Sequence, residues 1–201
     1  DLTGFTMATA AATSTVNISG AGATILSAVD TDITTIDASA TTGGVTMTGR
    51  TSTVVNNLTG GTGADTFIML NKGDVLDGGT GTDVLDINFA AILGGIEVDL
   101  SSTTSQVSTF NGSANAAAQV GFESVELTGY TGSFGAQVTA NKAGSTITGT
   151  VNTDSLTAGA GADVVIYNTI GASSVADSIN SFTSGTDKLH FATGLATSGG
   201  T

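Results

Sequence analysis

The sequence predicts an all-β fold, and within that class a right-handed parallel β-solenoid with glycine-rich turns. Three observations support this prediction. Threonine supplies 37 of the 201 residues and glycine 29, the apolar residues occur in short runs, and a unit of nine residues repeats within 51–86. Threonine, valine and isoleucine favour strands, whereas Gly, Asn, Asp and Ser favour turns. A fixed internal period constrains a fold more strongly than local propensity does, so the repeat carries most weight.

A step of nine residues links two rows of equivalent positions. The sixth residue of each unit has an oxygen-bearing side chain, and the eighth is large and apolar. The sixth positions are Asn56, Asp65, Asp74 and Asp83, and the eighth positions are Leu58, Phe67, Leu76 and Leu85. Six turn residues and three strand residues make half a coil, so eighteen residues make one full coil. The middle residue of each strand then points into the coil and stacks on its counterparts in neighbouring coils.

Glycines mark alternate units of this repeat. The segments GGTGADTFI (60–68) and GGTGTDVLD (78–86) share their glycines and their aspartate, and LTAGAGADVVI (156–166) is a third copy. Glycine suits such turns because it accepts positive φ and lets backbone carbonyls approach closely. With coils about 4.8 Å apart, the carboxylates of Asp65 and Asp83 would reach one ion. Two carboxylates and several carbonyls make an all-oxygen site, which suits calcium better than magnesium or a transition metal.

Short strands are also expected outside the repeat. Segments 33–49 and 121–134 read as short strands separated by Gly, Ser and Thr turns. The residues predicted to face inward there are Ile33, Ile36, Val45, Met47, Phe122, Val125 and Leu127.

The chain divides into two related halves, because TTIDAS precedes the first glycine turns as ESVELT precedes the third. We predict one solenoid segment over 1–100, which contains the units at 51–86, and a polar connecting stretch over 101–119. A second related segment is predicted over 120–201. The two halves are expected to continue one solenoid.

The charge balance limits the classes of partner. Seventeen acidic residues face four basic ones, Arg50, Lys72, Lys142 and Lys188, for a formal net charge of −13. Such a surface repels nucleic acid and anionic lipid but attracts metal cations. The chain has no cysteine, which excludes disulfides and thiol chemistry. No apolar run approaches the roughly 20 residues needed to span a bilayer, so we expect no membrane insertion. The chain starts at Asp1 without a leader, and we expect it to be a fragment of something longer.

The glycine segments resemble a known calcium-binding repeat. The pattern G-G-x-G-x-D-x-apolar-x of 60–68 and 78–86 resembles the RTX nonapeptide of proteins exported by type I secretion, whose fold is a parallel β-roll. The segment DSINSFTSGTDKLHF (177–191) is similar to one that commonly follows such rolls, although Ser181 and His190 stand where that segment usually has Asp. This resemblance implies a protein stabilised by several calcium ions.

The Thr-, Ala- and Gly-rich strands beside these turns are similar to those of bacterial RTX-type surface-layer proteins. The resemblance implies a structural module of a surface layer or a similar self-assembling array, located outside the bacterial cell on its surface. Its partners would be copies of itself or the rest of its own longer chain, with cell-surface polysaccharide as a further possibility. Two alternatives are the stalk of a large RTX adhesin and the calcium-dependent export and folding module of a type I secreted enzyme.

The candidate calcium ligands lie in the glycine turns and in the segment at 177–191. They are Gly60, Thr62, Asp65, Asp74, Asp77, Gly78, Thr80, Asp83, Gly159, Asp163, Asp177 and Asp187. The alternative for each aspartate is that it only caps its turn by accepting backbone N–H bonds. The turn of Asp74 has lost the double glycine and contains Lys72, which favours a solvated turn whose carboxylate is neutralised by that lysine. Asp77 has the alternative of facing water.

No constellation typical of an enzyme is present in the sequence. His190 is the only histidine, and its surroundings predict a structural or solvent-facing role. Glu123 and Glu126 lie three apart, which in a strand places them on opposite faces and makes them a poor acid/base pair. Threonines repeated on a flat β-face can bind ice, and Thr62 and Thr80 hold equivalent positions in the two glycine turns. An ice-binding face needs a longer uninterrupted array of threonines than these two. We therefore predict that this chain is not an enzyme.

Overall fold

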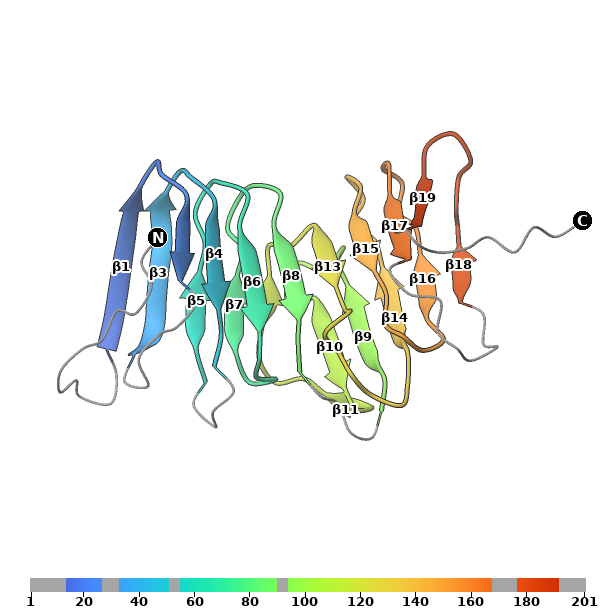
Figure 1. Cartoon of the computed structure of the whole chain (residues 1–201), viewed down its shortest axis with the longest axis horizontal. Helices are drawn as coiled ribbons and strands as arrows, with labels where there is room; N and C mark the ends of the chain where they lie inside the picture. The colour runs from blue at the N-terminus through green and yellow to red at the C-terminus, as the bar shows by residue number, and fades with distance from the viewer. Residues whose placement is uncertain (1–13, 27–32, 51–54, 90–93, 168–176, 192–201) are drawn as a thin grey trace, which may run out of the picture.

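A computed structural model describes residues 14–26, 33–50, 55–89, 94–167 and 177–191. Every regular element among them is a β-strand. The strands stack side by side along the long axis, from β1 (Ser14–Gly20) near one end to β19 (Lys188–Phe191) at the other (Figure 1). The chain is therefore an all-β parallel solenoid, as the sequence predicts. The described residues include no helix long and apolar enough to cross a membrane.

One face of the solenoid is a single parallel sheet of eight described strands. In spatial order they are β2 (Thr24–Leu26), β4 (Val45–Thr48), β6 (Thr66–Met69), β8 (Val84–Ile87), β13 (Ser124–Glu126), β15 (Thr146–Thr148), β17 (Val164–Tyr167) and β19.

The opposite face consists of two sheets. The first is parallel and contains β1, β3 (Ile33–Thr41), β5 (Asn57–Thr59), β7 (Val75–Asp77) and β12 (Gln119–Val120). The second contains, in order, β11 (Ser113–Ala114), β10 (Val107–Phe110), β9 (Ile96–Asp99), β14 (Ala136–Thr139), β16 (Ser155–Thr157) and β18 (Ser178–Asn180). Outside the segment from β9 to β11, the chain alternates between the two faces, so one strand from each face makes a coil.

Eighteen-residue coils occur where the nine-residue units predict them. Phe67 pairs with Leu85 between β6 and β8, and Leu58 pairs with Leu76 between β5 and β7. All four side chains are at most 2% exposed. The eighth positions of the repeat are therefore core positions, although the first residues of the repeat, 51–54, lie outside the described residues.

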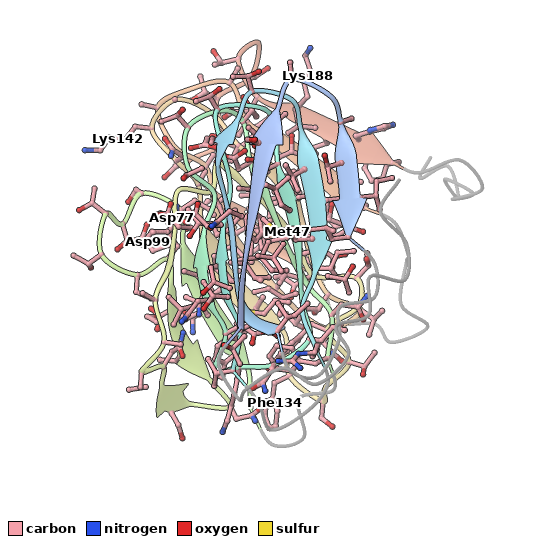
Figure 2. The ribbon with its side chains drawn as sticks, turned by 90° about the vertical axis from the view of Figure 1, so that its left-hand side faces the viewer. Met47, Asp77, Asp99, Phe134, Lys142 and Lys188 are labelled. Carbon is pink, nitrogen blue, oxygen red and sulfur yellow. The ribbon has the colours of Figure 1, made fainter. Side chains whose placement is uncertain are left out.

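The core is one continuous cluster between the two faces. Figure 2, which looks along the solenoid, shows Met47 in this interior. The seven residues predicted to face inward outside the repeat are at most 2% exposed, which confirms them: Ile33, Ile36, Val45, Met47, Phe122, Val125 and Leu127. Phe67 and Phe122 meet edge to face, with ring centroids 5.3 Å apart.

A long excursion interrupts the regular coils after β8. Leu85 pairs with Val125, which lies forty residues further on instead of eighteen. The intervening chain forms β9, then β10 antiparallel to β9, and then the short β11. Two strands, β10 and β11, thus lie within the predicted connecting stretch at 101–119, and β12 begins at its last residue. The division into two related segments stays a prediction.

Two buried glutamines attach this excursion to the solenoid. The amide of Gln106 donates to the carbonyl of Phe122 at 2.6 Å and accepts from the N–H of Phe122 at 2.9 Å. The side chain of Gln119 donates to the carbonyl of Asp74 at 2.6 Å. Because both glutamines are at most 2% exposed, these bonds replace water for groups that the core would otherwise leave unsatisfied.

The central core predicts a large effect for one aromatic truncation. Phe67→Ala should lower the free energy of unfolding by about 3 to 5 kcal/mol, because it leaves a cavity beside Phe122. Phe134→Ala is the matched control, since Phe134 is 53% exposed. Urea unfolding followed by circular dichroism measures both. Equal losses for the two variants would contradict the assigned core.

Candidate metal sites in two ladders of buried carboxylates

Two rows of polar side chains follow the turns of the solenoid. The first ladder consists of residues directly before strands of the eight-stranded sheet: Asp65, Asp83, Glu123, Ser145, Asp163 and Asp187. The second ladder consists of residues directly before strands of the opposite face: Asn56, Asp74, Asp154 and Asp177. Asp65, Asp74 and Asp83 are 0% exposed, and ionisable side chains are rarely buried so completely.

Backbone amides connect the first ladder from coil to coil. The N–H of Asp65 donates to Oδ1 of Asp83 at 2.7 Å, and the N–H of Asp83 donates to Oε2 of Glu123 at 2.8 Å. The same bond occurs nearer the C-terminus, from Ser145 to Asp163 at 2.7 Å and from Asp163 to Asp187 at 3.0 Å. Each carboxylate thus ties its own turn to the preceding one.

The second carboxylate oxygen caps its own turn in three rungs of the first ladder. It accepts the N–H of the residue four positions earlier: Gly61 for Asp65 at 2.8 Å, Gly159 for Asp163 at 2.7 Å and Thr183 for Asp187 at 2.7 Å. The capping role considered for these aspartates is therefore present. It does not exclude a metal role, because an ionised carboxylate has about four acceptor positions.

Asp83 departs from this arrangement. Its Oδ2 atom is buried and has no hydrogen-bond partner. The amide four positions earlier, that of Gly79, donates instead to Oδ1 of Asp77 at 3.0 Å. Burial, with the negative charges of Asp65, Glu123 and Asp77, raises the pKa of Asp83 to about 7. The glycine turn at 78–83 therefore contains a buried carboxylate oxygen, Oδ2 of Asp83, that has no hydrogen-bond partner.

Asp74 in the second ladder corrects one expectation from the sequence. The predicted solvated turn is wrong, because Asp74 is fully buried and accepts the N–H of Asn56 at 2.9 Å. Lys72 is exposed, and the cation that acts on Asp74 is Arg50, which is only 8% exposed. Burial still raises the pKa of Asp74 to about 6, although Arg50 opposes the shift.

Asp154 is a ladder residue that the sequence interpretation missed. It accepts N–H bonds from Ala136 at 2.7 Å and Thr150 at 2.8 Å, and its own N–H donates to Asp177 at 2.8 Å. Burial raises its pKa. A step of nine backward from Asp163 lands on Asp154, so the rule that found Asp65 and Asp83 would also have found this residue.

The remaining predicted ligands lie in the same turns. Gly60 and Gly78 are buried, whereas Thr62, Thr80 and Asp77 are exposed. The two glycines lie against each other in adjacent coils, because a side chain on Gly60 would overlap the carbonyl oxygen of Gly78. The structure thus brings Gly60 and Gly78 together and leaves the two threonine side chains facing solvent.

Within the described part of the chain, no three side chains of His, Asp or Glu are grouped closely enough to hold a metal ion by themselves. An ion in these turns would therefore take some of its ligands from backbone carbonyls, as the sequence predicts. His190 lies exposed on β19, in agreement with the predicted solvent-facing role.

The raised pKa values predict a pH dependence for the protein in chelator. Asp86 pairs with Glu126 across β8 and β13. Burial, and to a smaller extent the negative charge of Glu126, raises the pKa of Asp86 to about 6. A carboxyl whose pKa is higher in the folded than in the unfolded state stabilises the fold at low pH. The free energy of unfolding should therefore fall as pH rises from about 4 to about 7.

Asp86→Asn should flatten part of this fall, whereas Glu97→Gln at an exposed position should leave it unchanged. Chemical unfolding at a series of pH values, with chelator throughout, measures the slope. A free energy of unfolding that increases over this range would contradict the carboxyl assignments.

Comparison with known proteins places the chain in a family. A search of curated proteins found no match. A family model described as "Peptidase M10 serralysin C terminal" matches residues 31–198. Serralysin C-terminal domains are the non-catalytic part of a peptidase family, contain calcium-binding RTX-type repeats and belong to secreted proteins. Because the match spans most of the sequence, this chain belongs to the serralysin C-terminal family of RTX-type calcium-binding domains.

Proposed function

We propose that this chain is a calcium-stabilised structural module of a self-assembling bacterial cell-surface array. The observation that carries the calcium role is the first ladder, in which Asp65 and Asp83 are fully buried in a chain with a net charge of −13. Burying a charge is costly unless a group of opposite charge or good hydrogen bonds compensate it. Asp83 lacks that compensation at Oδ2.

The residues of the two glycine turns fit calcium. Asp65 and Asp83 would supply carboxylate oxygens, and Gly60 and Gly78 would supply backbone carbonyls. Hard oxygen donors without nitrogen or sulfur suit calcium, which tolerates irregular distances. The other proposed ligands are Thr62, Asp77, Thr80, Gly159, Asp163, Asp177 and Asp187, whereas Arg50 already supplies a positive charge beside Asp74.

Calcium would act on folding as well as on charge. Each ion would offset negative charge between adjacent turns and hold neighbouring coils together. Because the ligands come from different coils, the free energy of binding becomes free energy of folding. Extracellular calcium modules bind at about 10⁻⁴ to 10⁻³ M, so such a chain would fold after export from a calcium-poor cytosol.

The ends of the solenoid support assembly. Among the described strands, β2 and β19 each pair on one side only. Both carry exposed apolar side chains, Ile25 (48%) on β2 and Leu189 (43%) and Phe191 (51%) on β19. An unpaired strand edge with apolar side chains is suited to pairing with another strand. We propose that copies of this chain, or further parts of its own protein, add strands there, with surface polysaccharide as a further partner.

A second candidate function is the export and folding module of a type I secreted enzyme. The family match favours it, because the matching family is the non-catalytic C-terminal part of a peptidase family. The stalk of an RTX adhesin is a third possibility with the same calcium chemistry. Both of these roles need calcium binding but no self-assembly. A test of whether the protein assembles in calcium therefore distinguishes them from the surface-array role.

The calcium role predicts that Asp65→Asn with Asp83→Asn will reduce binding. Calorimetric titration of the wild type should show several ions per chain, and the double variant should lose at least one. Asparagine keeps an acceptor oxygen for the ladder amides, so the variant should still fold. The decisive measurement is the rise in melting temperature on adding millimolar calcium, which should shrink in the double variant.

Asp37→Asn with Asp99→Asn is the matched control, since both are partly exposed and lie outside the ladders. The control should keep the calcium-dependent rise of the wild type. The calcium role is wrong if wild-type circular dichroism and melting temperature are the same in chelator and in millimolar calcium.

The assembly role predicts larger particles in calcium. Light scattering and electron microscopy of the wild type should show filaments or sheets after calcium is added. Leu189→Asp with Phe191→Asp should block this growth without changing the number of ions bound, whereas Phe134→Asp, at an exposed turn, should not. Dispersed monomers of wild type in calcium would instead favour the export module.

A further inference from the structure

We infer that Glu123 is a ligand of a cation site shared with Asp83, which fastens the chain returning from the β9–β11 excursion to the glycine turn at 78–83. This inference rests on the proposed calcium role and adds a residue that the nine-residue repeat does not contain. It also assigns the site a role, which is to hold the returning chain at Glu123 against the turn that contains Asp83.

Glu123 holds a ladder position by its contacts. Oε2 of Glu123 accepts the N–H of Asp83, just as Oδ1 of Asp83 accepts the N–H of Asp65. Val125, two residues after Glu123, pairs with Leu85, two residues after Asp83. Glu123 is thus the next rung of the first ladder, although it lies forty residues beyond Asp83.

The rung at Asp83 contains the oxygen that needs a partner. The corresponding oxygens of Asp65, Asp163 and Asp187 each accept an amide of their own turn. Oδ2 of Asp83 accepts none and is shielded from solvent. An unsatisfied buried carboxylate oxygen is costly, and a bound cation would remove that cost.

The surroundings of this oxygen fit a cation. The place that a Cβ atom of Gly78 would take lies 3.0 Å from Oδ2 of Asp83 and in direct contact with the carbonyl oxygen of Gly121. Two oxygens from different coils therefore lie near one point that carries no side chain, and the Cβ atom of Asp83 lies 3.0 Å from the same point. At the equivalent point beside Gly60, the Oδ2 atom of Asp65 already accepts the N–H of Gly61.

The neighbouring charges favour a metal cation. Glu123 and Asp65 add negative charge around Asp83. The equivalent unpartnered oxygen, Oδ2 of Asp74, lies in the field of Arg50, so that turn has a cation of its own. The charged groups that act on the carboxylate of Asp83 are Asp65, Glu123 and Asp77, which are all acidic. A divalent cation held by oxygen atoms meets this need, and calcium is the ion we assign.

Glu123→Gln tests the assignment, with Glu126→Gln as its matched control. Both glutamates are partly buried, lie three residues apart and carry the same charge, but Glu126 faces its neighbour Asp86 across the outer side of the sheet. Glutamine keeps an acceptor for the N–H of Asp83, so Glu123→Gln should fold. Calorimetric titration with calcium should show one ion fewer per chain, or binding at that site at least tenfold weaker.

A second measurement locates the effect. In the wild type, calcium should slow hydrogen exchange of the amides in 119–126, and Glu123→Gln should remove this protection while Glu126→Gln keeps it. Asp83→Asn should lose the same ion, and Asp83→Asn with Glu123→Gln should lose no further one.

The outcomes separate the two proposals. If the wild type binds no calcium, the proposed function fails and the shared site fails with it. If the wild type and Glu123→Gln bind the same number of ions with the same affinity, the calcium role stands and the assignment of Glu123 is overturned. Loss of an ion in Asp83→Asn but not in Glu123→Gln would overturn it as well.

Discussion

The structure depends on the compensation of carboxylates that are buried between coils. The charge of −13 is not spread only over the surface, because Asp65, Asp74 and Asp83 are fully buried. Backbone amides supply most of the compensation, and in doing so they fix each coil to its neighbour at the spacing of parallel strands. The same groups therefore set the coil geometry and create the need for a cation.

This constraint explains why the turns are rich in glycine. A side chain on Gly60 would overlap both the next coil and the carboxylate of Asp65, and one on Gly78 would overlap the carbonyl of Gly121. Glycine thus lets the carboxylate reach the amide of its own turn. In the turn at 78–83, Gly79 has a φ of 91°, which few other residues adopt, and its amide contacts Asp77. In this turn the amide that would cap Asp83 is therefore used by Asp77, and Oδ2 of Asp83 has no hydrogen-bond partner.

The sequence predicts the fold well where the coils have a regular length, because contacts between coils then occur at a fixed sequence spacing. The step of nine finds Asp65 and Asp83 because regular eighteen-residue coils place equivalent residues in contact. It does not reach Glu123, because the excursion places that residue forty positions after Asp83 instead of eighteen, and sequence spacing no longer reports contact. Arg50 was missed for a related reason: Lys72 is nearer to Asp74 in the sequence, yet burial and long-range packing select the arginine.

Asp74 and Asp83 show two ways to meet one electrostatic requirement. Both are fully buried, both accept or donate ladder bonds, and both have an oxygen without a hydrogen-bond partner. Beside Asp74 the chain supplies a guanidinium, which is always charged and needs no external ion. Beside Asp83 the nearby groups are further carboxylates, so the opposing charge has to come from solution. Dependence on a cation should therefore be concentrated where the 78–83 turn meets the returning chain, because the turn beside Arg50 carries its own positive charge.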